Sequence, residues 1–129
     1  MAGREVVGLD GLRKLLEIIA ADSSVEHVGL LFGRGSRALV YVPLRNVYGA
    51  RDKFQGDAWD IVVAFTMAER YGLELVAVYH NHPCGEPRPS KYDLEGMKRW
   101  PYIWVIASKR EIRAWKKTSR GLVEVGVTG

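Results

Sequence analysis

Residues 76–93 read Val-Ala-Val-Tyr-His-Asn-His-Pro-Cys-Gly-Glu-Pro-Arg-Pro-Ser-Lys-Tyr-Asp, an apolar run that ends in two histidines. Side chains alternate between the two faces of a strand, so His80 and His82 are expected to point to the same side. Asp93 falls near the start of a predicted helix. Two imidazoles and one carboxylate leave a tetrahedral zinc ion one open position, which is typical of a catalytic metal site.

Each part of this pattern also fits a purely structural role. Ser90-x-x-Asp93 ahead of Leu94 and Met97 is a capping-box pattern, in which both side chains satisfy amides at the start of a helix. Two histidines after a strand can be ordinary polar residues at a strand-to-loop junction. The combination favours a metal site, because three of the five prolines fall within residues 83–89 and stiffen the loop that joins the ligands.

The spacing within residues 80–93 resembles the JAMM (MPN+) zinc metalloprotease motif, in which the second histidine of His-x-His-Pro is followed, after a gap of seven residues that includes the proline, by Ser-x-x-Asp. A glutamate on an early strand completes that motif. Residues 25–33, Val-Glu-His-Val-Gly-Leu-Leu-Phe-Gly, resemble this strand, with Glu26 at the matching position. Asn81 stands where the family usually has Ser or Thr, so the run is closer to the RadC-like bacterial branch of the superfamily. This departure bears on the substrate more than on the metal.

The resemblance implies a role for each motif residue. His80, His82 and Asp93 would hold Zn²⁺ as the cofactor. Glu26 would act as general base and Ser90 would donate a hydrogen bond to the oxyanion, which makes both catalytic residues. His27 is a rival to Glu26, but strand alternation turns the two side chains to opposite faces, so only one can face the site.

The implied activity is hydrolysis of the (iso)peptide bond after the C-terminus of a ubiquitin-like or sulfur-carrier-like protein, whose tail would lie along a strand edge. Two alternatives stay open: a RadC-like DNA-associated protein of the same fold, and a non-catalytic MPN scaffold that binds partners. A complete set of ligands plus a base argues against the scaffold. The net charge of +4 is modest, and no nucleic-acid recognition signature accompanies it, so the sequence argues against a nucleic-acid partner.

The neighbours of the predicted ligands have structural interpretations. Cys84 could offer a thiolate, but its place in the proline-rich turn favours a loop residue. Asn81 should project away from the metal and hydrogen-bond to backbone.

Length and composition predict one domain over residues 1–129, since 47% hydrophobic and 26% charged residues are ordinary values for a globular protein, and the resemblance implies that this domain is of the JAMM/MPN type. A single cysteine excludes an intrachain disulfide. The hydrophobic runs 61–65 and 102–107 are too short to span a bilayer, and the N-terminus lacks the apolar segment of a signal peptide. We therefore expect a cytoplasmic protein without a membrane partner. The oligomeric state stays open, with a homodimer as one option.

Apolar periodicity predicts helices over residues 9–21, 57–71 and 90–99. It predicts strands over residues 25–32, 38–47, 73–79, 102–108, 112–116 and 122–127. Asp10 is expected to cap the first helix, Gly72 to end the second, and Pro43 to place its strand at an edge or a bulge, with a loop over 48–56. This order predicts an α/β (α+β) sandwich with a mostly antiparallel, curved sheet flanked by helices, and the resemblance implies that it is of the MPN/JAB1-like (cytidine-deaminase-like) type.

Overall fold

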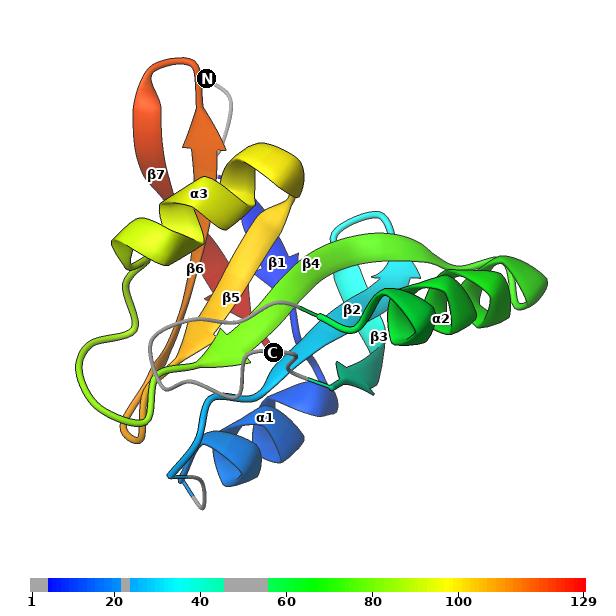
Figure 1. The fold of residues 1–129 in the computed structure, drawn as a ribbon, viewed down its shortest axis with the longest axis horizontal. Coiled ribbons are helices and arrows are strands. Elements are labelled where there is room, and N and C mark those ends of the chain that lie inside the picture. The colour runs from blue at the N-terminus through cyan, green and yellow to red at the C-terminus, as the bar shows by residue number, and fades with distance from the viewer. Residues whose placement is uncertain (1–4, 22–23, 46–55) are drawn as a thin grey trace.

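A computed structural model describes residues 5–21, 24–45 and 56–129, which form a curved sheet with helices packed against both of its faces (Figure 1). The strands are β1 (Val6–Gly8), β2 (Val28–Arg34), β3 (Arg37–Leu44), β4 (Glu74–Asn81), β5 (Ile103–Ala107), β6 (Ile112–Thr118) and β7 (Gly121–Thr128). The helices are α1 (Leu12–Ala21), α2 (Ala58–Arg70) and α3 (Lys91–Arg99). No helix in these ranges is long and apolar enough to cross a membrane.

The strands follow the order β1-β3-β2-β4-β5-β6-β7, and the sheet closes where β1 pairs with β7. Among the described residues, four pairings are antiparallel, namely β2 with β3, β2 with β4, β5 with β6, and β6 with β7. The three parallel pairings join β4 to β5 and β1 to both β3 and β7. The result is a mixed, curved sheet with antiparallel pairs in the majority, which agrees with the predicted fold class.

Strand β4 lies at the centre of this arrangement, between β2 and β5. On one face Ala77 and Tyr79 pack in a core that includes Leu16 of α1, and on the other Val78 packs in a second core with Trp104. Helices α2 and α3 contribute to the second core. Because both faces are covered, residues 75–79 of β4 are all apolar, as predicted for a central strand.

The start of the chain differs from the prediction. Strand β1, which the periodicity does not predict, has three residues and pairs in parallel with β7 from Val6↔Gly126 onward. The first helix begins at Leu12, and Asp10 does not cap it. Instead Asp10 has a φ of 39°, and its carboxylate accepts a hydrogen bond from Nε of Arg37 at 2.6 Å. A strand this short carries too few residues for a periodic signal, and its partner lies at the far end of the chain.

The boundaries of the next two strands also shift. Strand β2 begins at Val28, so residues 25–27 precede it. The predicted end of the following strand and most of the predicted loop lie in residues 46–55, outside the described residues. Within the described part, β1 reaches β3 only at Arg37, so β3 has an open edge at Pro43, as the proline predicts.

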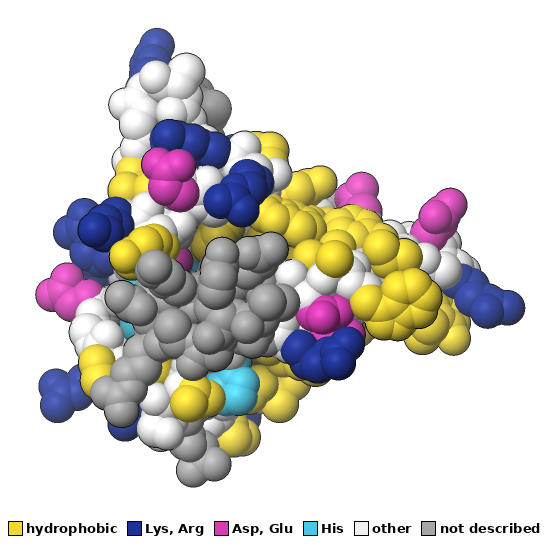
Figure 2. Space-filling view, viewed as in Figure 1, with side chains coloured by type: hydrophobic (Ala, Val, Ile, Leu, Met, Phe, Trp, Pro, Cys, Tyr) yellow, Lys and Arg dark blue, Asp and Glu magenta, His cyan; other side chains and the backbone are white. Residues whose placement is uncertain are grey.

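Helix α2 begins and ends as predicted. Asp57 caps it by accepting a hydrogen bond from the amide of Asp60, and Gly72 follows its C-cap with a φ of 68°. Its outer face exposes large hydrophobic side chains, which gather over α2 in Figure 2. We call this the α2 apolar surface, defined by Trp59, Val62, Val63 and Met67.

Candidate metal centre

Both histidines of the motif lie at the end of the central strand. His80 is paired with Val28 of β2 on one side and with Ile106 of β5 on the other. The amide of His82 donates to the carbonyl of Ala107 at 2.7 Å, which continues the pairing with β5 past the end of β4. The two imidazole rings lie on the same side with their centroids 4.9 Å apart. The alternation argument therefore describes their orientation correctly.

Asp93 enters the site from the first turn of α3. It forms a capping box with Ser90: the Asp93 amide donates to Ser90 Oγ at 3.2 Å, and the Ser90 amide donates to Asp93 Oδ2 at 2.8 Å. The Asp93 carboxylate is 2% exposed and lies against both histidines. Its Oδ1 is 3.2 Å from His80 Nε2, and its Oδ2 is 3.1 Å from His82 Nε2. Helix cap and metal ligand are therefore compatible roles, because the cap holds the carboxylate in place.

Glu26 reaches the site from the segment that precedes β2. It is buried, and its Oε1 lies 2.6 Å from His80 Nδ1. His27, the next residue, is exposed and lies outside the cluster of metal-ligating groups. Of the two residues only Glu26 lies in the cluster, although neither residue lies within the strand itself.

In each imidazole ring, Nδ1 lies within hydrogen-bonding distance of an acceptor. A carboxylate and a backbone carbonyl only accept, so Nδ1 carries the proton in both rings: in His80 it donates to Glu26, and in His82 it donates to the carbonyl of Glu86 at 2.8 Å. Such bonds select the tautomer and orient the ring. Both Nε2 atoms are therefore directed toward Asp93.

Glu26, His80, His82 and Asp93 each offer one ligand atom, and these atoms lie within 4.8 Å of one another. Zinc bonds of about 2.0–2.1 Å in tetrahedral geometry would separate neighbouring ligand atoms by about 3.3 Å. The observed Nε2 to carboxylate distances of 3.2 and 3.1 Å match this separation. The mixture of imidazole and carboxylate also suits a divalent metal, so the residues fit such an ion.

The charges of the cluster favour a cation at its centre. Burial by itself lowers the pKa of His80, but Asp93 and then Glu26 outweigh it and raise that pKa to about 9. Burial likewise raises the pKa of Asp93, but His80, His82 and the Ser90 amide outweigh it and hold the pKa well below its ordinary value. A metal ion bound at His80 Nε2 would take the place of the second proton, which the imidazole holds at Nε2 when it is positively charged.

Two further predicted residues have clear positions. Ser90 is half-buried, and its Oγ accepts from the Asp93 amide, a bond that does not use its own O–H donor. Cys84 is exposed in the turn after His82 and lies outside the cluster, in agreement with the prediction of a loop residue.

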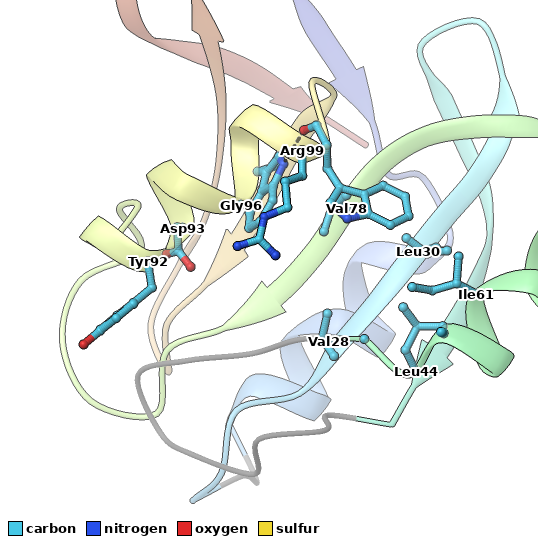
Figure 3. A pocket seen from close by; sticks show the side chains of 13 residues that line it. Val28, Leu30, Leu44, Ile61, Val78, Tyr92, Asp93, Gly96 and Arg99 are labelled. Atoms are coloured by element: carbon cyan, nitrogen blue, oxygen red, sulfur yellow. Dashed lines mark hydrogen bonds between the residues drawn. The ribbon is translucent and has the colours of Figure 1, made fainter.

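A cavity of about 200 Å³ adjoins Asp93 (Figure 3). Helix α3 forms one wall, where the side chains of Asp93 and Arg99 both point into the space. The opposite wall is apolar and comes from β2, β3 and α2, including Leu30, Leu44 and Ile61. The cavity therefore borders the candidate metal centre at Asp93 and is apolar on its opposite side.

Helix α3 packs closely on β5 at this cavity because of one glycine. A Cβ on Gly96 would lie 2.7 Å from Cη2 of Trp104, closer than real side chains approach. No motif of the sequence gives Arg99 a role, and the structure places it in the cavity lining. Its signal is helical spacing, since Tyr92, Gly96 and Arg99 are separated by four and three residues and line one face of α3.

The chain matches the family model of prokaryotic homologs of the JAB domain over residues 10–118. It belongs to this family. The chain is 41% identical over 105 residues to the desampylase of Pyrococcus furiosus, covering 81% of this chain and 74% of that protein. It is 36% identical over 91 residues to a probable TtuB-protein conjugate cleaving protease of Thermus thermophilus, covering 70% of this chain and 60% of that protein.

Solved structures agree with the fold of this JAB-family protein. A protein from Desulfitobacterium hafniense matches with a TM-score of 0.78 at 21% identity, over 95% of this chain and 90% of that one. A JAB1/MPN domain protein from Archaeoglobus fulgidus matches with a TM-score of 0.63 at 19% identity, over 98% of this chain and all of that one. The predicted family and fold are confirmed, and so is the predicted class of protein, a hydrolase of the JAMM type.

Proposed function

We propose that this JAB-family protein is a zinc-dependent isopeptidase that hydrolyses the bond after the C-terminus of a ubiquitin-like or sulfur-carrier-like protein. The observation that carries the proposal is the convergence of both Nε2 atoms on the Asp93 carboxylate, with Glu26 bound to the other side of His80. The relatives named desampylase and TtuB-protein conjugate cleaving protease support a protein conjugate as the substrate.

His80, His82 and Asp93 would hold the zinc ion. When bound, zinc would supply Lewis acidity, which polarises the scissile carbonyl and makes water a stronger nucleophile at neutral pH. Glu26 would accept a proton from the attacking water and deliver one to the departing amine, because its carboxylate is buried beside His80. Ser90 would donate its O–H to the carbonyl oxygen as that oxygen gains negative charge.

The cavity beside Asp93 would receive the extended C-terminal tail of the substrate. Its volume of about 200 Å³ suits a narrow segment, since sites for drug-sized ligands measure about 300–1,000 Å³. Leu30, Leu44 and Ile61 offer apolar contacts to the tail. Arg99 offers guanidinium donors to its carbonyl oxygens, and Figure 3 shows this side chain inside the cavity.

The body of the substrate protein would pack on the α2 apolar surface. Trp59 is 69% exposed there, and contiguous apolar surface of this kind marks contact sites between proteins. Trp59 and Val63 also line a groove between α2 and the open edge of β3. Leu44 lines both this groove and the cavity, so the body and the tail of one substrate would contact adjoining surfaces.

The direct test combines metal analysis with a cleavage assay. The purified protein is expected to hold about one zinc ion per chain and to release ubiquitin-like proteins from conjugates made with the same organism's modifiers. A chelator should abolish cleavage and added zinc should restore it. Cleavage that continues unchanged after complete removal of metal would exclude the proposed mechanism.

A further inference from the structure

Glu26 lies just outside the part of the chain that the sheet holds. The register between β2 and β4 begins at Val28↔His80, and residues 25–27 come before it. A catalytic carboxylate must nevertheless be placed closely, because a displacement of about 1 Å can cost about 100-fold in rate. The segment around Glu26 therefore needs an anchor other than regular strand pairing.

The side chain of Asn81 is that anchor. Its Oδ1 accepts a hydrogen bond from the amide of His27 at 2.6 Å, and its Nδ2 donates to the carbonyl of Val25 at 3.3 Å. The backbone amide of Asn81 donates to the carbonyl of His27 at 3.3 Å. The three bonds engage the residues on both sides of Glu26, and the Asn81 side chain is fully buried.

Asparagine suits this task because its carboxamide carries the same donor and acceptor as a peptide group. It thereby extends the pairing between β4 and the incoming chain beyond the first residue of β2. A serine or threonine side chain is shorter and has a single hydroxyl in place of the amide's separate acceptor and donor, and aspartate accepts but does not donate.

We propose that Asn81 is a positioning residue that places Glu26 against His80, and that it does so through the backbone of residues 25 and 27. The inference rests on the proposed function, because Asn81 affects catalysis only if Glu26, the residue that it positions, acts as the general base. Asn81 is buried, and alternation turns its side chain to the face of β4 opposite to His80 and His82. It would therefore act on the reaction only through Glu26.

The variants Asn81→Ala, Asn81→Asp and Asn81→Ser test the proposal. Asn81→Asp keeps the oxygen that accepts from the His27 amide and loses the N–H that donates to the Val25 carbonyl. This variant therefore tests the anchor even if Asn81→Ala does not fold. The matched control is Ser108→Ala, which removes a buried side chain that accepts from the backbone amides of Arg110 and Glu111 in the turn between β5 and β6 and makes no contact with residues 25–27 in the hydrogen bonds of the described residues.

The first readout needs no substrate. In ¹⁵N NMR spectra, the Nδ1–H resonance of His80 reports its bond to Glu26, and amide exchange at His27 reports the anchor. Both should change in the Asn81 variants and stay unchanged in Ser108→Ala, while zinc content stays at the wild-type level. An unaltered His80 resonance in Asn81→Ala and Asn81→Asp would overturn the proposal, whether or not the protein proves to be an isopeptidase.

The second readout is a double-mutant cycle. Asn81→Ala should lower kcat about 100-fold with KM within about two-fold of wild type. In a Glu26→Gln background the same change should cost less than about three-fold, because the residue it places no longer acts as a base. An undiminished loss in that background, or a loss of zinc that accounts for the lost activity, would overturn the positioning role. Failure of the wild-type protein to cleave any conjugate would instead count against the proposed function.

Discussion

His80 Nδ1 lies 2.6 Å from Glu26 Oε1, although the two residues are 54 positions apart in the chain. The contact ties the first residue of the motif to the central strand and turns Nε2 of His80 toward Asp93. Acceptors of this kind on a ligand histidine change metal affinity by about 10–100-fold when they are removed. Glu26 thus has an orienting role beside its proposed role as a base.

Two substitutions of Glu26 should separate these roles. Glu26→Gln keeps an oxygen that accepts from Nδ1, so zinc affinity should stay within a few-fold of wild type while kcat falls by about 10²–10⁴. Glu26→Ala should lose the activity and also weaken zinc binding by about 10–100-fold. Competition with a chromogenic chelator measures the affinities. Cleavage at the wild-type rate by Glu26→Gln would refute the assignment of the base.

Ser90 should affect both stability and catalysis, because it caps α3 and faces the site. Ser90→Ala should lower the free energy of unfolding by about 1 kcal/mol and lower kcat by about 10²–10³. The matched control is Asp57→Ala, which removes the cap of α2 and should cost a similar stability while activity stays intact. Denaturant unfolding and steady-state kinetics give both numbers. Equal kinetic effects in the two variants would remove the oxyanion role.

The metal-free protein should lose stability as the pH rises from about 6.5 to 9. The pKa of His80 is raised from 6.5 to about 9 in the folded state, so its contribution is fully present below pH 6.5 and is lost through pH 9. The effect should reach ~3 kcal/mol, or on the order of 10 °C in Tm. The pKa of Asp93 is lowered, so its contribution is present above about pH 4 and is lost in more acidic solution.

Zinc should reverse the alkaline part of this profile. An ion that displaces the His80 proton should bind about tenfold more tightly per pH unit between about pH 6.5 and 9. Thermal melts of metal-free and zinc-loaded protein across this range measure both effects. Asp93→Asn removes the carboxylate that does most to raise the pKa of His80 and should flatten the metal-free profile. A metal-free Tm that rises toward pH 9 would contradict the assignment.

Arg99 should act on substrate binding alone. Arg99→Ala should raise KM about tenfold, because the substrate tail loses one hydrogen bond from a charged donor. The kcat and the zinc content should stay unchanged. Its neighbour Lys98 forms an exposed ion pair with Glu95 instead of lining the cavity, so Lys98→Ala is the matched control and should behave as wild type. A fall in kcat without a change in KM would place Arg99 in the chemical step instead of the tail site.

The α2 apolar surface should be needed for protein conjugates but not for folding. Trp59→Ala should raise KM for a conjugate by about 10-fold or more and leave Tm within about 2 °C, since Trp59 is 69% exposed. Ile18→Ala on α1, where Ile18 is 54% exposed, is the control. Sedimentation of wild type and Trp59→Ala identifies the occupant. A wild-type dimer that dissociates in the variant would assign this surface to a second copy of the chain.

The sequence by itself determined the local parts of the site. Alternation along a strand is enough to turn His80 and His82 to one side, and the Ser90-x-x-Asp93 spacing is enough to predict the capping box. Both depend on backbone geometry within a few residues. The apolar run before His80 is likewise enough to predict a central strand, because only a strand covered on both faces tolerates such a composition.

Only the tertiary structure decided which residues from other segments contact these parts of the site. Four features join segments that are remote in sequence or lie on different elements. They are the contact of Glu26 with His80, the anchoring of Glu26 by Asn81, the closure of the sheet through β1, and the entry of Arg99 into the cavity. The order of strands and the packing of α3 on Trp104 bring them together. Residue spacing encodes geometry over one strand or one helical turn, whereas these contacts depend on how the whole sheet closes and packs.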